Sequence, residues 1–211
     1  MKWALLLASA ALAADAVETW RFDSLDKIGG HAVKVEGAPR VVNGTVVFDG
    51  VKDALFFDVH PLAGAETWTW EVIFRPDVGG AAEQRFFHLQ EEGADTRMLF
   101  EIRVIDGKWC LDSYAHWGTA GQALMDRAKL HELGKWHAVQ AVYDGREFRN
   151  YVDGVLEGKK EVALKPQAAG RTSVGVRINR VNYFKGAVYS SRFTKRALNV
   201  SEFEKLPAGL R

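Results

Sequence analysis

Cysteine is almost absent from this chain, because Cys110 is the only one among 211 residues. An intramolecular disulfide is therefore excluded, and a chain of this length must rely on a hydrophobic core instead. A reactive thiol needs a histidine and a third group arranged around it, and nothing near Cys110 in the sequence suggests them. We therefore interpret Cys110 as a small strand residue.

An excess of charge of one sign is also missing. The 28 basic and 27 acidic residues are well mixed and give a net charge of +1. Nucleic acids and anionic membranes bind surfaces of positive charge, so the composition argues against either as the main partner. The six histidines are scattered without metal-ligand spacing, and the sequence has no phosphate-binding loop or nucleophile elbow.

Long apolar runs are missing beyond the first dozen residues. A short basic start is followed by an apolar run at residues 3–12, which is too short to span a bilayer. Small residues at 11–13 match the positions that a signal peptidase reads. We expect residues 1–13 to be a removed signal peptide and residues 14–211 to be one secreted or periplasmic domain; the alternative is a buried N-terminal helix.

The rest of the chain consists of short runs rich in β-branched and aromatic residues. Residues 68–75 alternate cleanly, with Trp68 and Trp70 on one face and Thr69 and Glu71 on the other. We expect Trp68, Trp70 and Trp136 to be core residues. Only residues 121–129 and 201–205 look helical. Four Asx-Gly pairs predict tight turns: Asn43-Gly44, Asp106-Gly107, Asp144-Gly145 and Asp153-Gly154. This pattern predicts an all-β sandwich or barrel.

Several motifs in fixed order narrow the fold further. They are Val47-Phe48-Asp49-Gly50, residues 68–76, Trp136-His137-Ala138-Val139 with Tyr143-Asp144-Gly145, Tyr151-Val152-Asp153-Gly154, Phe184-Lys185-Gly186 and Arg196-Ala197-Leu198. In these motifs the chain resembles the laminin-G-like jelly-roll domains, in their bacterial branch, of the concanavalin A-like lectin/glucanase superfamily. The resemblance implies a two-sheet antiparallel jelly-roll sandwich whose concave sheet is available for a ligand. Such domains include lectins, adhesion modules and glycoside hydrolases, so the fold does not choose among these functions.

The chain departs from the family pattern at a possible calcium site. The closing strand often carries an acidic pair in the family, but this chain has Tyr189 and Ser190 there. Asp49 and Asp53, near an early turn, could still supply oxygen ligands to a structural calcium ion. Alternatively, these two side chains only shape the turn. Calcium is the one cofactor that the sequence suggests.

A second departure concerns catalysis. The glucanase members use two glutamates on one strand, in the order Glu, any residue, Asp, two residues, Glu, and no stretch of this chain matches that order. Glu91 and Glu92 are adjacent, so on a strand they would face opposite ways. We therefore expect binding rather than catalysis.

The candidate ligand-binding residues are mostly polar side chains that alternation places away from the core. A mixture of acids, amides and aromatic rings of this kind suits sugar hydroxyls and sugar C–H faces. The alternatives are cross-strand ion pairs for the charged residues and a buried, hydrogen-bonded amide for the asparagine in the strand at 147–152. The candidates are Glu71, Glu101, Arg103, Asp112, Tyr114, His116, Gln140, Asn150 and Asn179.

Three functions follow from these observations. We favour a secreted, lectin-like module that binds carbohydrate or another extracellular surface, and it requires a shallow groove with an exposed aromatic ring. The alternative is a polysaccharide hydrolase or lyase that uses acid/base residues such as Glu71, Glu101 and His116, clustered in one cleft with perturbed pKa values. A third possibility is a protein-binding adhesion module, which requires an exposed apolar patch.

Overall fold

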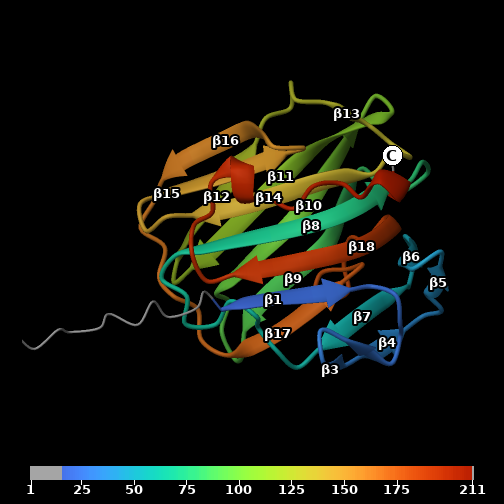
Figure 1. Ribbon diagram of the computed structural model, residues 1–211, viewed down its shortest axis with the longest axis horizontal. Helices are drawn as coiled ribbons and strands as arrows, with labels where there is room; N and C mark the ends of the chain where they lie inside the picture. The colour runs from blue at the N-terminus through green and yellow to red at the C-terminus, as the bar shows by residue number, and fades with distance from the viewer. Residues whose placement is uncertain (1–15, 211) are drawn as a thin grey trace, which may run out of the picture.

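Two large antiparallel sheets, stacked face to face, make up most of the protein (Figure 1). The computed structural model describes residues 16–210, so the predicted signal peptide at 1–13 lies outside the described residues. The predicted all-β sandwich is confirmed. No helix in the described part of the chain is long and apolar enough to cross a membrane.

We call the first sheet the back sheet. β18 is at its centre, with β8 on one side and both β6 and β1 on the other. In spatial order its strands are β16 (Val155–Glu161), β15 (Glu147–Val152), β14 (His137–Tyr143), β8 (Trp68–Pro76), β18 (Lys185–Thr194), β6 (Thr45–Asp49) and β5 (Arg40–Val42), with β1 (Val17–Arg21) paired to β18.

We call the second sheet the front sheet. In spatial order its strands are β12 (Ala120–Met125), β11 (Lys108–Trp117), β10 (Arg97–Ile105), β9 (Glu83–Glu91), β17 (Gly170–Val174), β7 (Ala54–Phe57) and β4 (Lys34–Glu36), with β13 (His131–Glu132) paired to β11. The remaining elements are a small hairpin of β2 (Lys27–Ile28) and β3 (His31–Ala32) and two 3₁₀ turns, η1 (Val200–Glu202) and η2 (Ala208–Leu210).

Aromatic rings fill the space between the two sheets. Trp70 of β8 lies 4.3 Å from Phe100 of β10, measured between ring centroids. Phe74 of β8 stacks on Phe86 of β9 at 4.1 Å, and Phe86 stacks in turn near Phe100 at 5.7 Å. All four side chains are buried. Contacts of this kind fix the spacing of the sheets and leave only the outer face of each for other uses.

The hairpin turns follow the sequence prediction. Asn43, Asp106 and Asp153 have φ values of 51°, 50° and 50°, and the glycine after each also has a positive φ. Two successive residues of this conformation form the turn that matches the twist of paired strands. The Asp106 turn joins β10 to β11, which fixes which of their residues lie opposite each other.

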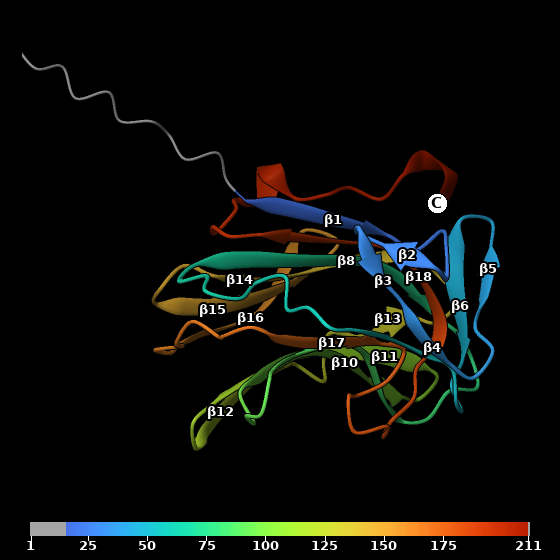
Figure 2. The same cartoon turned by 90° about the horizontal axis from the view of Figure 1, so that it is seen from below.

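The outer faces of the two sheets differ in what covers them. Figure 2 shows the C-terminal segment lying over the outer side of the back sheet. β12 and the loop after β17 bend away from the sandwich on the other side, so the front sheet has a concave outer face between them (Figure 2). The cover explains why Thr69 and Glu71, on the outer side of β8, are buried although they are polar.

Two expectations were wrong and one was partly right. Residues 121–129 do not form a helix, because residues 120–125 pair with β11 as the edge strand β12, and tertiary pairing overrides helix propensity. Trp136 is not a core residue: it is half-buried on the outer side of the back sheet with the Arg75 guanidinium 5.3 Å from its ring. The predicted helix at 201–205 is the short turn η1.

A glycine at the start of the loop after β17 offers a test of this packing. Gly175 has φ +85°, and a Cβ there would lie 2.4 Å from the Phe48 ring, whereas Gly44 has φ +71° with open space around it. We expect Gly44→Ala to cost about 1–2 kcal/mol for the backbone conformation alone. Gly175→Ala adds a steric clash in a packed core and should cost about 1–3 kcal/mol more. Urea unfolding of both variants measures the difference, and equal losses would contradict the close packing.

Candidate functional site

The concave outer face of the front sheet brings together five of the nine candidate binding residues. Glu101 of β10 lies directly opposite Asp112 of β11. The inward side of the same two strands carries core residues such as Phe100 and Leu111. Alternation therefore sends the polar set outward. The five residues are Glu101, Arg103, Asp112, Tyr114 and His116.

Ion pairs join four charged side chains of this face into a continuous row, which we call the ladder. Its members are Arg85, Glu101, Arg103 and Asp112. Arg85 of β9 donates from Nε to Glu101 Oε1 over 3.0 Å. Arg103 Nη2 lies 2.9 Å from Glu101 Oε2 and 2.7 Å from Asp112 Oδ2. The four side chains are only 5–16% exposed, so solvent screens these pairs less than it screens ordinary surface pairs.

The ladder leaves polar atoms that have no hydrogen-bond partner among the described residues. These atoms are Asp112 Oδ1, Arg103 Nη1 and Arg85 Nη1, and all three are buried. An unpaired buried polar atom is costly, so a ligand that supplies the complementary donor or acceptor gains affinity there. Arg85 Nη1 lies 3.6 Å from Glu83 Oε2, so the two atoms left without any such partner are one acceptor, Asp112 Oδ1, and one donor, Arg103 Nη1.

Asp112 is the most perturbed acid of the ladder. Burial and, after it, the negative charge of Glu101 raise its pKa to about 6, against the opposing charge of Arg103. Asp112 therefore exchanges its proton in weakly acidic solution, unlike an ordinary aspartate.

An aromatic cluster lies at one end of the ladder. Tyr114 is half-buried, and the Arg97 guanidinium lies 5.3 Å from the centre of its ring. Arg97 also forms an ion pair with Asp95, which holds the pKa of that carboxyl below its usual range. His116 Nδ1 donates to the Asp95 carbonyl over 2.9 Å. These contacts fix Tyr114 and His116 beside one another on the concave face.

The loop after β17 forms the opposite rim. Its backbone is tied to the sheet by Ile178, whose N–H donates to His88 Nδ1 over 3.0 Å. Burial, then the nearby positive charge of Arg177, lowers the pKa of His88 well below its usual value, so this imidazole is neutral. Burial and the positive charge of Arg97 in turn lower the pKa of the Arg177 guanidinium. Asn179, the sixth candidate near this face, is exposed in the same loop.

Sequence reasoning missed the cationic residues Arg85, Arg97 and Arg177 and the buried His88. Arg85 was missed because of a β-bulge in the pairing of β9 with β10. The bulge shifts the alternation of side chains along β9, so that Arg85 lies opposite Glu101. Arg97 carried a usable signal, since it shares the outward parity of Glu101 in the strand at 97–105.

Glu71 and Gln140 lie on the outer side of the back sheet, with the aromatic core between them and the ladder. Glu71 accepts a hydrogen bond from the Glu204 backbone N–H at 2.7 Å and pairs with Arg192. The structure therefore does not bring Glu71 into one cleft with Glu101 and His116, the acid/base set that the sequence suggested.

Asn150 lies inside the sandwich. Its Nδ2 donates to Ser113 Oγ at 3.2 Å and to the Leu124 carbonyl at 3.0 Å. This is the buried, hydrogen-bonded amide that the sequence allowed as the alternative to ligand contact.

The two aspartates of the early turn are occupied by backbone groups. Asp49 Oδ1 accepts the N–H groups of Val51, Lys52 and Asp53, and the two Asp53 oxygens accept those of Ala38 and Asp49. Within residues 16–210, no group of three or more His, Cys, Asp or Glu side chains is arranged to hold a metal. Calcium at Asp49 and Asp53 stays a prediction, and the turn-shaping role accounts for these contacts.

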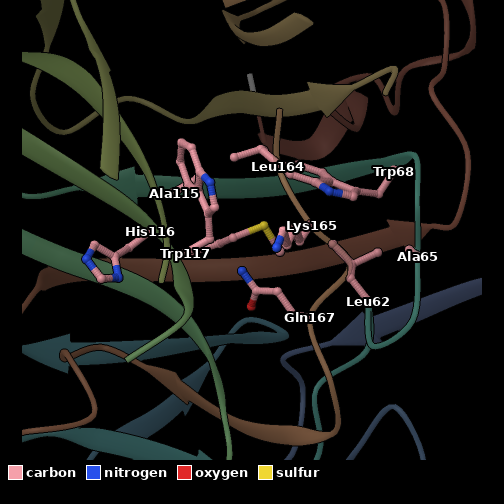
Figure 3. Close-up of a pocket in the computed structure, with 10 residues that line it drawn as sticks. Leu62, Ala65, Trp68, Ala115, His116, Trp117, Leu164, Lys165 and Gln167 are labelled. Atoms are coloured by element: carbon pink, nitrogen blue, oxygen red, sulfur yellow. The ribbon is translucent and has the colours of Figure 1, made fainter. Parts of the chain in front are cut away.

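A very small pocket opens where β11 ends. It has a volume of about 10 Å³, which is room for about one water molecule. Figure 3 shows Trp117 turned toward Leu164, while the His116 ring stands apart from the rest of the lining. Gln167 is held by a 2.8 Å hydrogen bond to His60. This pocket is too small for a sugar, so it is not the candidate site.

The comparison with protein families agrees with the architecture. The family described as "Concanavalin A-like lectin/glucanases superfamily" matches residues 49–203. No curated protein sequence matches the chain.

Solved structures share the fold at low sequence identity. Domain 4 of AbnA, an extracellular arabinanase from Geobacillus stearothermophilus solved with arabinotriose, has a TM-score of 0.65 and 16% identity, covering 89% of this chain and 96% of that domain. Trypanosoma rangeli sialidase in complex with sialic acid has a TM-score of 0.66 and 17% sequence identity. The match covers 92% of this chain but only 33% of the sialidase. The SAP-like pentraxin of Limulus polyphemus has a TM-score of 0.56 and 20% sequence identity. The match covers 80% of this chain and 78% of the pentraxin chain. These likenesses show the fold alone.

The raised pKa of Asp112 predicts how stability depends on pH. The folded state holds this proton up to about pH 6, whereas the unfolded chain releases it near its ordinary value of 3.8. The free energy of unfolding therefore falls as pH rises between these values and stays low above them. Asp112→Asn should stabilise the protein at neutral pH, on the order of 3 kcal/mol, with the gain vanishing near ~pH 4.

Denaturant unfolding across this pH range measures the effect. Asp95→Asn is the matched control, because the pKa of Asp95 is lowered and its removal should instead weaken the protein at neutral pH. A pH-independent difference between Asp112→Asn and the parent would contradict the buried, proton-binding state of Asp112.

Proposed function

Because the chain belongs to the concanavalin A-like lectin/glucanases superfamily, we propose that it is a secreted, lectin-like module that binds carbohydrate on the concave face of its front sheet. The observation that carries this proposal is the ladder of Arg85, Glu101, Arg103 and Asp112, which leaves buried polar atoms unpaired on an uncovered face. Tyr114 supplies an aromatic ring next to it.

The chemistry of the ladder suits sugar hydroxyls. A hydroxyl can donate to Asp112 Oδ1 and accept from Arg103 Nη1, so a pair of neighbouring hydroxyls can satisfy both atoms at once. The Tyr114 ring, half-buried and held by Arg97, can pack against the C–H face of a sugar. Because the ladder is built on paired strands and its own ion pairs, its side chains are held in place before a ligand arrives.

Two solved structures of the same fold support this proposal. The arabinanase domain was solved with arabinotriose and the sialidase with sialic acid. This chain spans nearly all of the arabinanase domain but about a third of the sialidase, so the sialidase reaction itself is not carried over. Secretion rests on the predicted signal peptide at residues 1–13.

A tyrosine on each outer face allows a matched test of the binding surface. Tyr114 and Tyr189 are both half-buried, and each has an arginine over its ring, at 5.3 Å and 4.6 Å. A glycan array with residues 14–211 would first identify a polysaccharide, with calcium and with EDTA to test the predicted calcium site. Tyr114→Ala should then raise the Kd about tenfold, through lost stacking, and Tyr189→Ala should leave it unchanged.

The array result can also reject the proposal. No binding on the array, with calcium or with EDTA, would contradict simple glycan binding and favour a protein partner. Equal effects of the two tyrosine variants would place the binding surface elsewhere.

A second candidate function is acid/base catalysis on polysaccharide at the same concave face. The specific observation is that Glu101 and Asp112 lie opposite each other on one face and that the pKa of Asp112 is raised to about 6. A protonated carboxylic acid beside an ionised one is the arrangement that hydrolases and lyases use to move protons.

Release of new sugar ends from the bound polysaccharide tests this second candidate. With Asp112 as the acid, turnover should fall as pH rises through about 6, and Asp112→Asn should reduce it by a factor of at least ~100 while binding persists. Asp95→Asn, an exposed acid on the same face, is the control. Binding without any chain cleavage across this pH range would leave the module non-catalytic.

A further inference from the structure

A cavity of about 390 Å³ lies between the back sheet and the C-terminal segment. Ala138 and Gln140 of β14 form one side, and residues 200–206 form the other. Figure 1 shows the C-terminal segment crossing in front of β14, and Figure 2 shows it on the side of the back sheet that faces away from the front sheet. The cavity is therefore separated from the ladder by the whole aromatic core. Its volume is within the range of small-molecule sites.

The polar feature of this cavity is the side chain of Gln140. The residue is 1% exposed, and its Oε1 atom has no hydrogen-bond partner among the described residues. Glu71, which lies opposite Gln140 on β8, cannot supply one, because its carboxylate accepts hydrogen bonds from Arg192 and the Glu204 backbone and has none to donate. A buried amide oxygen without a partner is unfavourable, and the side chain that carries it lines the cavity.

The remaining lining restricts the chemistry of an occupant. Val200, Phe203 and Leu206 give the cavity a largely apolar wall. Asp153 and Glu204 also line it, so an anionic ligand would meet two acids with only Lys205 to balance them. A purely apolar ligand would leave Gln140 unpaired. A neutral molecule with hydroxyls on one edge and C–H groups on a face satisfies both parts of the wall.

The cavity is held open by contacts that do not involve a ligand. The Glu204 backbone is anchored to the Glu71 carboxylate at 2.7 Å, and Arg192 Nη2 donates to the Glu202 carbonyl at 2.7 Å. Phe203 packs edge-on against Tyr151, with ring centroids 5.1 Å apart. Since these contacts fix the covering segment, little ordering is required when a ligand enters.

We propose that this cavity is a second binding site, for a single neutral sugar residue whose hydroxyls pair with the Gln140 amide and whose C–H face lies against Phe203 and Leu206. The site goes beyond the front-sheet function, because it uses the opposite face of the sandwich and none of the ladder residues. A protein with both sites would bind carbohydrate on two faces.

Titration of the isotope-labelled chain, residues 14–211, tests this site by NMR. The probes are D-glucose, D-galactose, L-arabinose and N-acetyl-D-glucosamine, with glycerol as a small polyol that has no ring. At least one sugar should shift the backbone amides of Gly154, Phe203 and Lys205, and glycerol should bind far more weakly. Gln140→Met keeps the side-chain length and should raise the Kd of that sugar about tenfold.

Control variants separate this site from the front sheet. Tyr114→Ala should leave the amide shifts at the cavity unchanged, and Leu206→Trp, which fills the cavity, should abolish them. Thermal melting of Gln140→Met should show no loss of stability, because the amide oxygen it removes is unpaired. If Gln140→Met does not fold, the amide shifts of Leu206→Trp test the site instead.

Three outcomes would overturn the inference. The first is no shift at the cavity with any of the sugars, which would mean that it holds only water. The second is equal binding of glycerol, and the third is a sugar affinity unchanged by both cavity variants. Each of these can occur while polysaccharide binding at Tyr114 persists, so failure of the cavity site is distinguishable from failure of the front-sheet function.

Discussion

The aromatic layer between the two sheets is the constraint on which the rest of the structure depends. Trp70 and Phe74 on one sheet meet Phe86 and Phe100 on the other, and ring contacts at this spacing leave no room inside for charged side chains. Because side chains alternate along a strand, filling the interior commits every second residue of the central strands to the outside. The protein has no disulfide to share this role, since Cys110 is its only cysteine. The chemistry of the molecule is therefore confined to two outer faces.

The two faces solve the problem of buried acids differently. On the back sheet, Glu71 is covered by the C-terminal segment and receives hydrogen bonds from both Arg192 and the Glu204 backbone. On the front sheet, Asp112 shares Arg103 with Glu101, and Glu101 also pairs with Arg85. Burial raises the pKa of Asp112, and the nearby charge of Glu101 adds to this effect while the Arg103 charge opposes it. The acid on the back sheet anchors a segment, whereas Asp112 retains a buried oxygen that has no hydrogen-bond partner among the described residues.

The sequence predicted the sandwich and much of the front-sheet site because both depend on local patterns. Asp106-Gly107 indicates a hairpin, and the hairpin with alternation is sufficient to place Glu101, Asp112 and Tyr114 on one face. Non-local features could not be predicted in this way. The bulge that brings Arg85 opposite Glu101 leaves no clear signature in the residues themselves. Nothing in the alternation of β8 and β14 indicates that a segment more than 50 residues later in the chain than Gln140 covers their outer side. The same pattern therefore placed Glu71 with Glu101, although the core separates them.

The shallow shape of the front face bears on how a module of this kind could bind. A concave sheet without deep walls buries only part of a sugar, and its ladder atoms compete with water for the same hydroxyls, so one site of this type gives weak affinity. The rigid strands reduce the entropy lost on binding but do not add contacts. Strong attachment to a polysaccharide then requires either several sugar residues along the groove or a second point of attachment. The back-sheet cavity is proposed as such a point. Because it faces away from the ladder, the two sites would engage different polysaccharide chains or distant parts of one chain. Avidity would therefore depend on how densely the polysaccharide is packed.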